Sequence, residues 1–181
     1  PINRVMDSAD AWRDVGAKGH ELGNHSIFHP CRKNQTMDWL ADDYDLSSYT
    51  PRRWSDEMRV ASSVLSSLDG KAERSFGNTC CNTELGAGDT LHSLEPLIQE
   101  LFVAGRGAFT EQVVDVSTIN YSALGHFGAD DRDFEDLRQQ IDGAIETGGW
   151  IIYMIHGVGE GTHNLFIDPT QHQRLVDYLG E

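Results

Sequence analysis

The sequence has few cysteines and no long apolar run, and each shortage excludes a class of protein. The chain has three cysteines, Cys31, Cys80 and Cys81, and no C-x-x-C spacing. Because their number is odd, we expect no dense disulfide framework, and because the spacing is missing, we expect no zinc cluster of thiolates. Two arrangements stay open: one disulfide between Cys31 and either Cys80 or Cys81, or three free thiols. The longest apolar run, at 150–155, has the length of a buried strand and is far below the roughly 20 residues that span a bilayer.

Positive charge is also scarce. The chain has 14 Lys and Arg against 29 Asp and Glu, a formal net charge of -15. Such a surface repels phosphate backbones and anionic lipids, so we expect neither nucleic-acid nor membrane-surface binding, and a neutral or cationic ligand instead. The 181 residues fit one domain, 1–181, with a sizeable core.

Helical and strand patterns alternate along the chain. Helices are expected over 7–19, 50–70, 90–105, 130–149 and 168–181. Strands are expected at 20–25, 73–78, 106–109, 112–116 and 150–155. This alternation predicts an α/β fold with a parallel sheet, open or barrel-like, in which the chemistry lies at the carboxyl ends of the strands.

The clearest helix is the segment 50–70. Thr50 is a natural N-cap and Pro51 suits the first helical position, while Gly70 is a typical stop. An apolar stripe at helical spacing lies between them. The closing helix has the same start, with Asp168 followed by proline.

Two histidines stand four apart in the string GHELGNHSIFHPC at 19–31. Neutral imidazole is a common zinc ligand. Pro30 prevents a regular helix here, but one tight turn can bring the rings of His25 and His29 together. A loop with solvated histidines is the alternative. His156 follows the strand 150–155 directly, where a catalytic side chain is expected and a buried core histidine is the alternative.

The string GHELGNHSIFHP resembles the second motif of the polysaccharide deacetylases, carbohydrate esterase family 4. SFGNTCCNT at 75–83 is similar to the third motif, although Asn78, Thr79 and Cys81 depart from it. WIIYMIHGVGEG at 150–161 resembles the fifth. The resemblance covers almost the whole chain and implies a distorted (β/α) barrel of the polysaccharide deacetylase type, incomplete at its N-terminus.

This resemblance implies a metal-dependent hydrolase that removes acetyl groups from an acetylated oligo- or polysaccharide. His25 and His29 would be ligands of a divalent ion, zinc or else cobalt, and His156 would be the general acid. The backbone of Asn78 or Thr79 would donate to the oxyanion. The resemblance also favours a secreted or periplasmic protein.

The family's first motif, TFDDG, supplies the third metal ligand and the general base, and the chain has no such string. We expect it to lie before Pro1, in a part that the sequence does not include. The Ala-Asp-Asp strings at 41–43 and 129–131 are set aside because neither is predicted to follow a strand. Other candidate third ligands are Asp42, Asp43, Asp45 and Cys31.

Two other functions stay open: an amidohydrolase acting on small amides, and an inactive remnant that binds carbohydrate or metal. His163 is a second candidate for the role of His156. Surface positions are expected for His92, His126 and His172. Trp39 and Trp54 are candidates for stacking on sugar rings, with core burial as the alternative.

Overall fold

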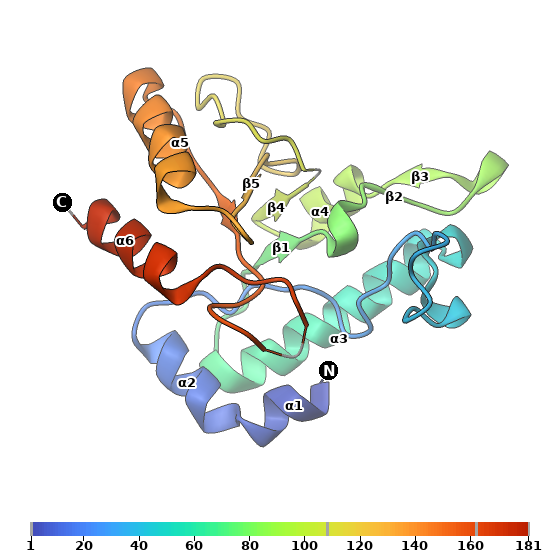
Figure 1. Ribbon diagram of the computed structural model, residues 1–181. Coiled ribbons are helices and arrows are strands. Elements are labelled where there is room, and N and C mark those ends of the chain that lie inside the picture. The colour runs from blue at the N-terminus through green and yellow to red at the C-terminus, as the bar shows by residue number, and fades with distance from the viewer. Residues whose placement is uncertain (1, 108, 162, 181) are drawn as a thin grey trace. The chain divides into compact units, whose positions relative to one another are not determined.

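The computed structural model describes residues 2–107, 109–161 and 163–180 (Figure 1). The protein is mixed α/β and 44% helical, as the sequence predicts. Its residues form two compact units, Pro1–Ala108 with Tyr121–Ala123, and Phe109–Asn120 with Leu124–Glu181. Each unit has an apolar core of its own.

The first unit is built around one long helix. Its helices are α1 (Ile2–Asp7), α2 (Ala9–Ala17), α3 (Pro51–Asp69) and α4 (Glu95–Leu101). Its strands are β1 (Ser75–Gly77), β2 (Glu84–Leu85), β3 (His92–Ser93) and β4 (Ala104–Arg106). Its short 3-10 turns are η1 (Asp42–Tyr44), η2 (Leu46–Ser48), η3 (Thr79–Cys81) and η4 (Gly88–Thr90). β1 and β4 pair in parallel, β2 and β3 antiparallel, and α2 and α4 both pack against α3.

The ends of α3 are those that the sequence predicts. The Thr50 hydroxyl accepts a hydrogen bond from the Arg53 N–H at 3.2 Å, and Gly70 ends the helix with a φ of 71°. A side chain at Gly70 would be strained in this left-handed conformation. Both signals act within one turn of chain, which is why the sequence alone could locate them.

One face of α3 enters the core of the first unit. Trp54 is 1% exposed, and its ring meets those of Phe76 and Phe102 edge-on, with centroids 5.3 and 6.4 Å away. Such aromatic pairs contribute about 0.5–1.5 kcal/mol each beyond their buried area. A sugar-stacking role for Trp54 is therefore wrong, because the ring is covered by the core.

The second unit places two helices on a short parallel sheet. Its elements are β5 (Phe127–Gly128), α5 (Phe134–Thr147), β6 (Tyr153–Met154) and α6 (Pro169–Leu179). β5 and β6 are parallel, and α5 packs against α6 around Leu137 and Ile167. The Asp168 side chain caps α6 by accepting from the N–H groups of Thr170 and Gln171, as predicted.

The strands are shorter than the sequence predicts. Across the described residues they form three two-stranded sheets and no closed barrel. The helix expected over 90–105 begins only at Glu95, because His92 and Ser93 pair with β2 in a hairpin. Of the strand expected at 20–25, Asn24 alone makes a bridge, to Phe76. Parallel pairing is confirmed for β1–β4 and β5–β6.

A buried ion pair fixes the end of α3 to the chain beside β1. The guanidinium of Arg74 donates to both carboxylate oxygens of Asp69, at 2.5 and 2.7 Å, and to the carbonyl of Leu22 at 3.0 Å. The two side chains are 1% and 4% exposed. Hydrogen bonds from Arg74 lower the pKa of Asp69 from 3.8 to about 2.

This shift predicts an acid-dependent loss of stability. The folded pKa lies below the unfolded one, so the contribution is complete above the unfolded pKa and disappears as pH falls through 3.8 towards 2. We expect about 2 kcal/mol of the free energy of unfolding to be lost over this window. Urea unfolding across this pH range measures it.

The variant Asp69→Asn is expected to cost about 3 kcal/mol at neutral pH, because it leaves the buried Arg74 without its counter-charge. Its free energy of unfolding should also change less with acid than that of the wild type. Asp10→Asn is the matched control, since Asp10 also pairs with an arginine, Arg13, but its side chain is fully exposed. Parallel pH curves for the wild type and Asp69→Asn would contradict this account.

Candidate functional site

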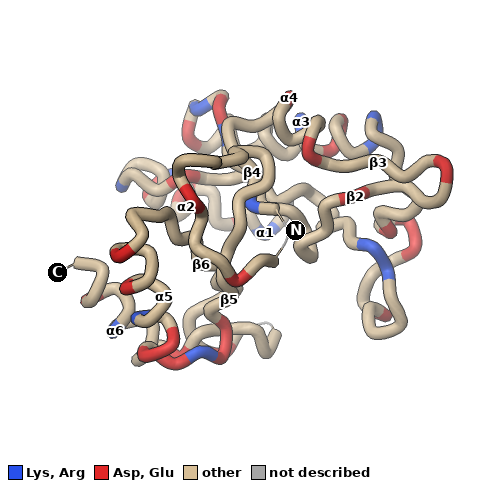
Figure 2. Tube along the Cα trace, turned by 90° about the horizontal axis from the view of Figure 1, so that it is seen from above, with Lys and Arg blue, Asp and Glu red and all other residues tan. Residues whose placement is uncertain are grey.

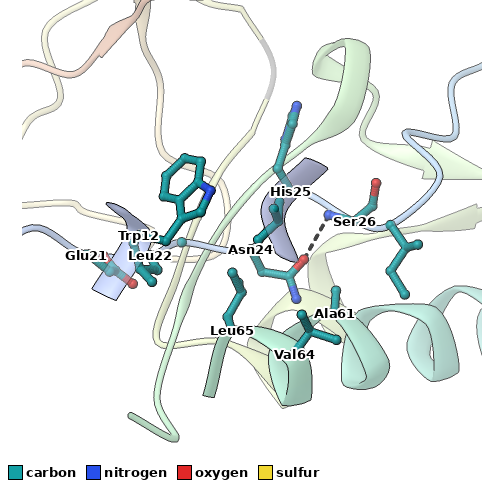
Figure 3. Close-up of a pocket in the computed structure, with 12 residues that line it drawn as sticks. Trp12, Glu21, Leu22, Asn24, His25, Ser26, Ala61, Val64 and Leu65 are labelled. Carbon is teal, nitrogen blue, oxygen red and sulfur yellow. Dashed lines mark hydrogen bonds between the residues drawn. The ribbon is translucent and has the colours of Figure 1, made fainter. Parts of the chain in front are cut away.

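Hydrogen bonds of the Asn24 side chain anchor the turn that carries the two histidines. This side chain is 1% exposed, and its amide nitrogen donates to the carbonyl of Met58 at 2.9 Å and to the Ser62 hydroxyl at 2.8 Å, both on α3. Its oxygen accepts from the Ser26 N–H at 2.8 Å, as Figure 3 shows. The backbone of Asn24 also bonds to β1, so one residue joins the turn to a helix and a strand.

A second anchor comes from the buried carboxylate of Glu57 on α3. One of its oxygens accepts from the N–H groups of Ile27 and Phe28, at 3.2 and 3.0 Å, and the other accepts from the Tyr49 hydroxyl at 3.1 Å. Burial, with the charge of Glu57 beside it, raises the pKa of Tyr49. The Tyr49 hydroxyl therefore keeps its proton and serves as a donor.

The chain between these anchors turns sharply. Ser26 and His29 have φ of 66° and 55°, a region that non-glycine residues enter at a cost. The Ser26 hydroxyl accepts from the His29 N–H at 2.9 Å and stabilises the turn. The turn brings the rings of His25 and His29 edge to face, with centroids 4.9 Å apart. The structure thus brings the predicted pair together.

The protonation of His25 follows from its partner. Its Nδ1 lies 2.7 Å from the carbonyl oxygen of Gly77, at the end of β1. A carbonyl only accepts, so Nδ1 carries the proton and Nε2 carries the lone pair that a metal ion needs. A Cβ at Gly77 would lie 3.3 Å from the His25 Nδ1 and 2.8 Å from an Arg106 nitrogen, so a side chain there would displace the imidazole and the guanidinium.

His29 lies beside a disulfide and an exposed indole. Cys31 and Cys80 are bonded, which is one of the two cysteine arrangements that the sequence leaves open, and Cys81 stays a thiol. The Nδ1 of His29 is 3.5 Å from the Cys31 sulfur. The ring of Trp39, a residue 61% exposed, has its centroid 6.0 Å from that of His29.

The predicted third ligands do not join this pair. Among the described residues, no carboxylate lies with both histidines within metal-ligand reach. The carboxylate of Asp45 accepts from the N–H groups of Lys33 and Ser47 instead. Asp42 pairs with the Lys33 ammonium at 2.5 Å, and Cys31 cannot supply a thiolate while it is in the disulfide.

The 3-10 turn η3, which begins at the predicted oxyanion donor Thr79, lies next to the histidine turn. The Thr79 hydroxyl donates to the carbonyl of Pro30, and the disulfide makes a second link between the turns. The N–H of Asn78 donates to the carbonyl of Arg106 at 3.0 Å, so it cannot also donate to an oxyanion. Of the two predicted donors, the N–H of Thr79 is the one with no acceptor within the part of the chain that the structure describes.

A cavity of about 370 Å³ opens beside the histidine turn. Its wall is mostly apolar and is formed by α1, α2, α3 and residues 21–27. In Figure 3, Ala61, Val64 and Leu65 line it from α3, and the His25 ring extends away from them. The cavity thus offers mostly apolar contacts, and Asn24 and His25 are among the polar residues of its lining.

The second unit contains a His–Asp pair. β5 and β6 are parallel, and Asp130 and His156 each follow within two residues of their ends. The Asp130 carboxylate lies 2.5 Å from the His156 Nδ1 and accepts from the His156 backbone N–H at 3.1 Å. The Asp130 side chain is 12% exposed and that of His156 is 36% exposed. The carboxylate fixes the orientation of the imidazole through Nδ1.

Asp130 is the residue that the sequence reasoning missed. The string at 129–131 was set aside because it is not predicted to follow a strand, and this was wrong, since β5 ends at Gly128. The Phe-Gly pair is too short to show an alternating pattern. The signal that could have identified Asp130 is the acidic pair at 130–131, which follows Phe-Gly-Ala at 127–129 and precedes α5.

Two other histidines of the second unit have distinct surroundings. The ring of His163 lies 5.8 Å from that of His156, and its Nδ1 accepts from the Leu165 N–H, so it lies next to the residue that it was proposed to replace. His126 is fully buried, 5.3 Å from the Phe109 ring. A surface position for His126 is therefore wrong, because its side chain has no solvent-exposed area.

The charge distribution agrees with the composition. Figure 2 shows acidic residues outnumbering basic ones along the trace. Within the described ranges, no helix combines the length and the apolar character that crossing a membrane requires.

The assignment of the Nδ1 proton gives a direct test. In alkaline solution, where imidazoles are neutral, nitrogen-15 NMR is expected to show His25 as the Nδ1–H tautomer, because the Gly77 carbonyl cannot donate. The exposed His92 on β3 is the control and should populate both tautomers. A His25 ring protonated at Nε2 would contradict the proposed ligand geometry.

The role of Glu57 is tested by its removal. Glu57→Ala leaves two backbone N–H groups and the Tyr49 hydroxyl without their acceptor, and we expect a loss of about 3 kcal/mol in the free energy of unfolding. Glu57→Gln keeps an acceptor oxygen and should cost less. Equal costs for the two variants, measured by urea unfolding, would show that the carboxylate does not anchor the turn.

Comparisons of the chain with protein-family profiles, with curated proteins and with solved structures found no match. The roles of its residues therefore rest on their chemistry and placement. Two features support a functional role: the anchored pair of His25 and His29 in the first unit, and the pair of His156 and Asp130 in the second.

Proposed function

We propose that the protein is a metal-dependent hydrolase that removes acetyl groups from a glycan. The observation that carries the proposal is the anchored pair of His25 and His29, which lies within a string resembling the second motif of the polysaccharide deacetylases. The distorted (β/α) barrel of that family is part of the proposal, and parallel pairing within each unit supports it.

The chain's residues divide the work as follows. His25 and His29 would hold a divalent ion, zinc or cobalt, and such an ion would lower the pKa of a bound water molecule and polarise the acetyl carbonyl. The Thr79 N–H donates to the oxygen on which charge develops. His156, held by Asp130, is the proposed general acid, which gives a proton to the departing amine or alcohol.

The donor set fits such an ion in kind but is short in number. Imidazole nitrogens suit zinc, and Nδ1 of His25 is held by a carbonyl as in known metal sites. Catalytic zinc usually has three protein ligands, and the described residues bring no carboxylate to the pair. This shortage favours a second candidate function, a protein that binds metal or carbohydrate without hydrolysis.

The surroundings of His29 support a sugar as the ligand. Trp39 is exposed next to the imidazole, and Phe28, 43% exposed, stacks on Tyr44 with centroids 4.8 Å apart. Exposed aromatic faces of this kind bind the apolar faces of sugar rings. The negative surface tolerates the cationic amine that N-deacetylation releases. The disulfide supports the secreted or periplasmic location that we propose.

The proposal predicts metal-dependent release of acetate from acetylated sugar oligomers. Chelation should abolish release, and Zn²⁺ or Co²⁺ should restore it. His25→Ala and His29→Ala are expected to lower the bound metal, because each removes a ligand. His156→Ala should keep the metal and lower kcat by about 10²–10⁴-fold, the usual contribution of a general acid.

His92→Ala is the matched control, since His92 is an exposed histidine on β3, and it should change neither metal content nor rate. Metal binding without acetate release would favour the non-hydrolytic candidate. Hydrolysis of small amides but not of sugar oligomers would favour an amidohydrolase. Unchanged metal content in His25→Ala would place the metal elsewhere and overturn the assignment.

A further inference from the structure

The disulfide lies against a histidine in a way that the proposed function does not use. One ligand atom from each of His29, Cys31 and Cys80 can be chosen so that all three lie within 4.8 Å of one another. We propose that reduction of the disulfide creates a second metal site, in which these two thiolates and the His29 imidazole bind Zn²⁺. This proposal does not depend on the hydrolytic function.

The distances suit a tetrahedral zinc ion. With Zn–S near 2.3 Å and Zn–N near 2.0 Å, ligand atoms lie about 3.6–3.8 Å apart. The His29 Nδ1 is already 3.5 Å from the Cys31 sulfur. The Cα atoms of the two cysteines are 5.7 Å apart, so rotation of their side chains can separate the sulfurs without moving the backbone. Two sulfurs and one imidazole leave a fourth position for water.

The exposure of the two cysteines sets the order of the exchange. Cys31 is fully buried and Cys80 is half-buried, so a dithiol reductant attacks the sulfur of Cys80. The S–S bond breaks, Cys31 leaves as a thiolate, and a mixed disulfide forms at Cys80. The second thiol of the reductant then displaces Cys80 and closes to its own disulfide. Two electrons reach the protein, and any protons on the two thiols pass to solvent as Zn²⁺ binds.

The proposed site uses the Nδ1 of His29, because the Cys31 sulfur lies 3.5 Å from that atom. Cys81, next in the chain to Cys80, keeps its thiol in the oxidised protein and contacts the Arg106 guanidinium at 3.9 Å. It is therefore a matched control for a thiol that is not a ligand of the proposed site.

Cobalt binding to the full chain tests the proposal. The protein is reduced with a dithiol, freed of reductant without oxygen, and titrated with Co²⁺. We expect one equivalent to bind with a thiolate-to-cobalt charge-transfer band, and no such band in the oxidised protein. The band should be lost in Cys31→Ser, Cys80→Ser and His29→Ala, and kept in Cys81→Ser.

His25→Ala separates the two proposals. It removes a ligand of the hydrolytic ion but none of the second site, so it should keep the band while it loses acetate release. Loss of the band in His25→Ala or Cys81→Ser, or its presence in the oxidised protein, would overturn the proposed site.

Alkylation of the wild type distinguishes Zn²⁺ binding by the folded reduced protein from Zn²⁺ binding by an unfolded reduced chain. Zn²⁺ should protect Cys31 and Cys80 from iodoacetamide in the reduced protein and leave Cys81 reactive, as peptide mass spectrometry would show. An unfolded chain would instead protect the adjacent Cys80 and Cys81 together. Equal protection of all three cysteines, or of none, contradicts the proposal.

Discussion

The side chain of Asn24 fixes where the two histidines of the first unit lie. Its amide bonds to two groups on α3 and its oxygen holds the N–H that starts the turn, while its backbone pairs with β1. A buried amide with every group bonded is stable in one orientation, because any other leaves polar atoms unpaired. The turn is therefore fixed to both α3 and β1 through a single residue.

One chemical device recurs at the candidate residues of both units. His25 meets the carbonyl of Gly77 and His156 meets the carboxylate of Asp130, in each case through Nδ1. Each partner can accept but not donate, so each fixes the tautomer as well as the ring. Nδ1 is thus occupied in both rings, and Nε2 is the atom to which we assign metal binding in one ring and proton transfer in the other.

Local signals in the sequence predicted much of this structure. Thr50, Gly70 and Asp168 act within a turn of their own helix, so their roles could be read without knowing the fold. The histidine pair was found because its spacing and its neighbours are contiguous. The parallel pairing followed from the alternation of elements along the chain.

Contacts between distant segments were beyond that reasoning. Glu57 bonds to residues 29 and 30 positions before it, and Asp130 to one 26 positions after it. Nothing in either neighbourhood marks such a partner. The strands were overestimated for a similar reason, because an apolar run shows burial but not how many of its residues find a hydrogen-bonding neighbour. Trp54 and His126 are buried although exposed positions were considered for both. Their burial depends on the residues from distant segments that pack around them.

The bond between Cys31 and Cys80 joins residues that are 49 positions apart and closes a covalent ring that contains α3. A single cut by a protease within that ring would therefore open a loop without releasing a fragment. The histidine turn lies just outside one end of the ring and η3 at the other, so both would stay tethered to each other after the cut. Such a chain can lose the continuity of a surface loop and still keep its candidate site in one covalent piece.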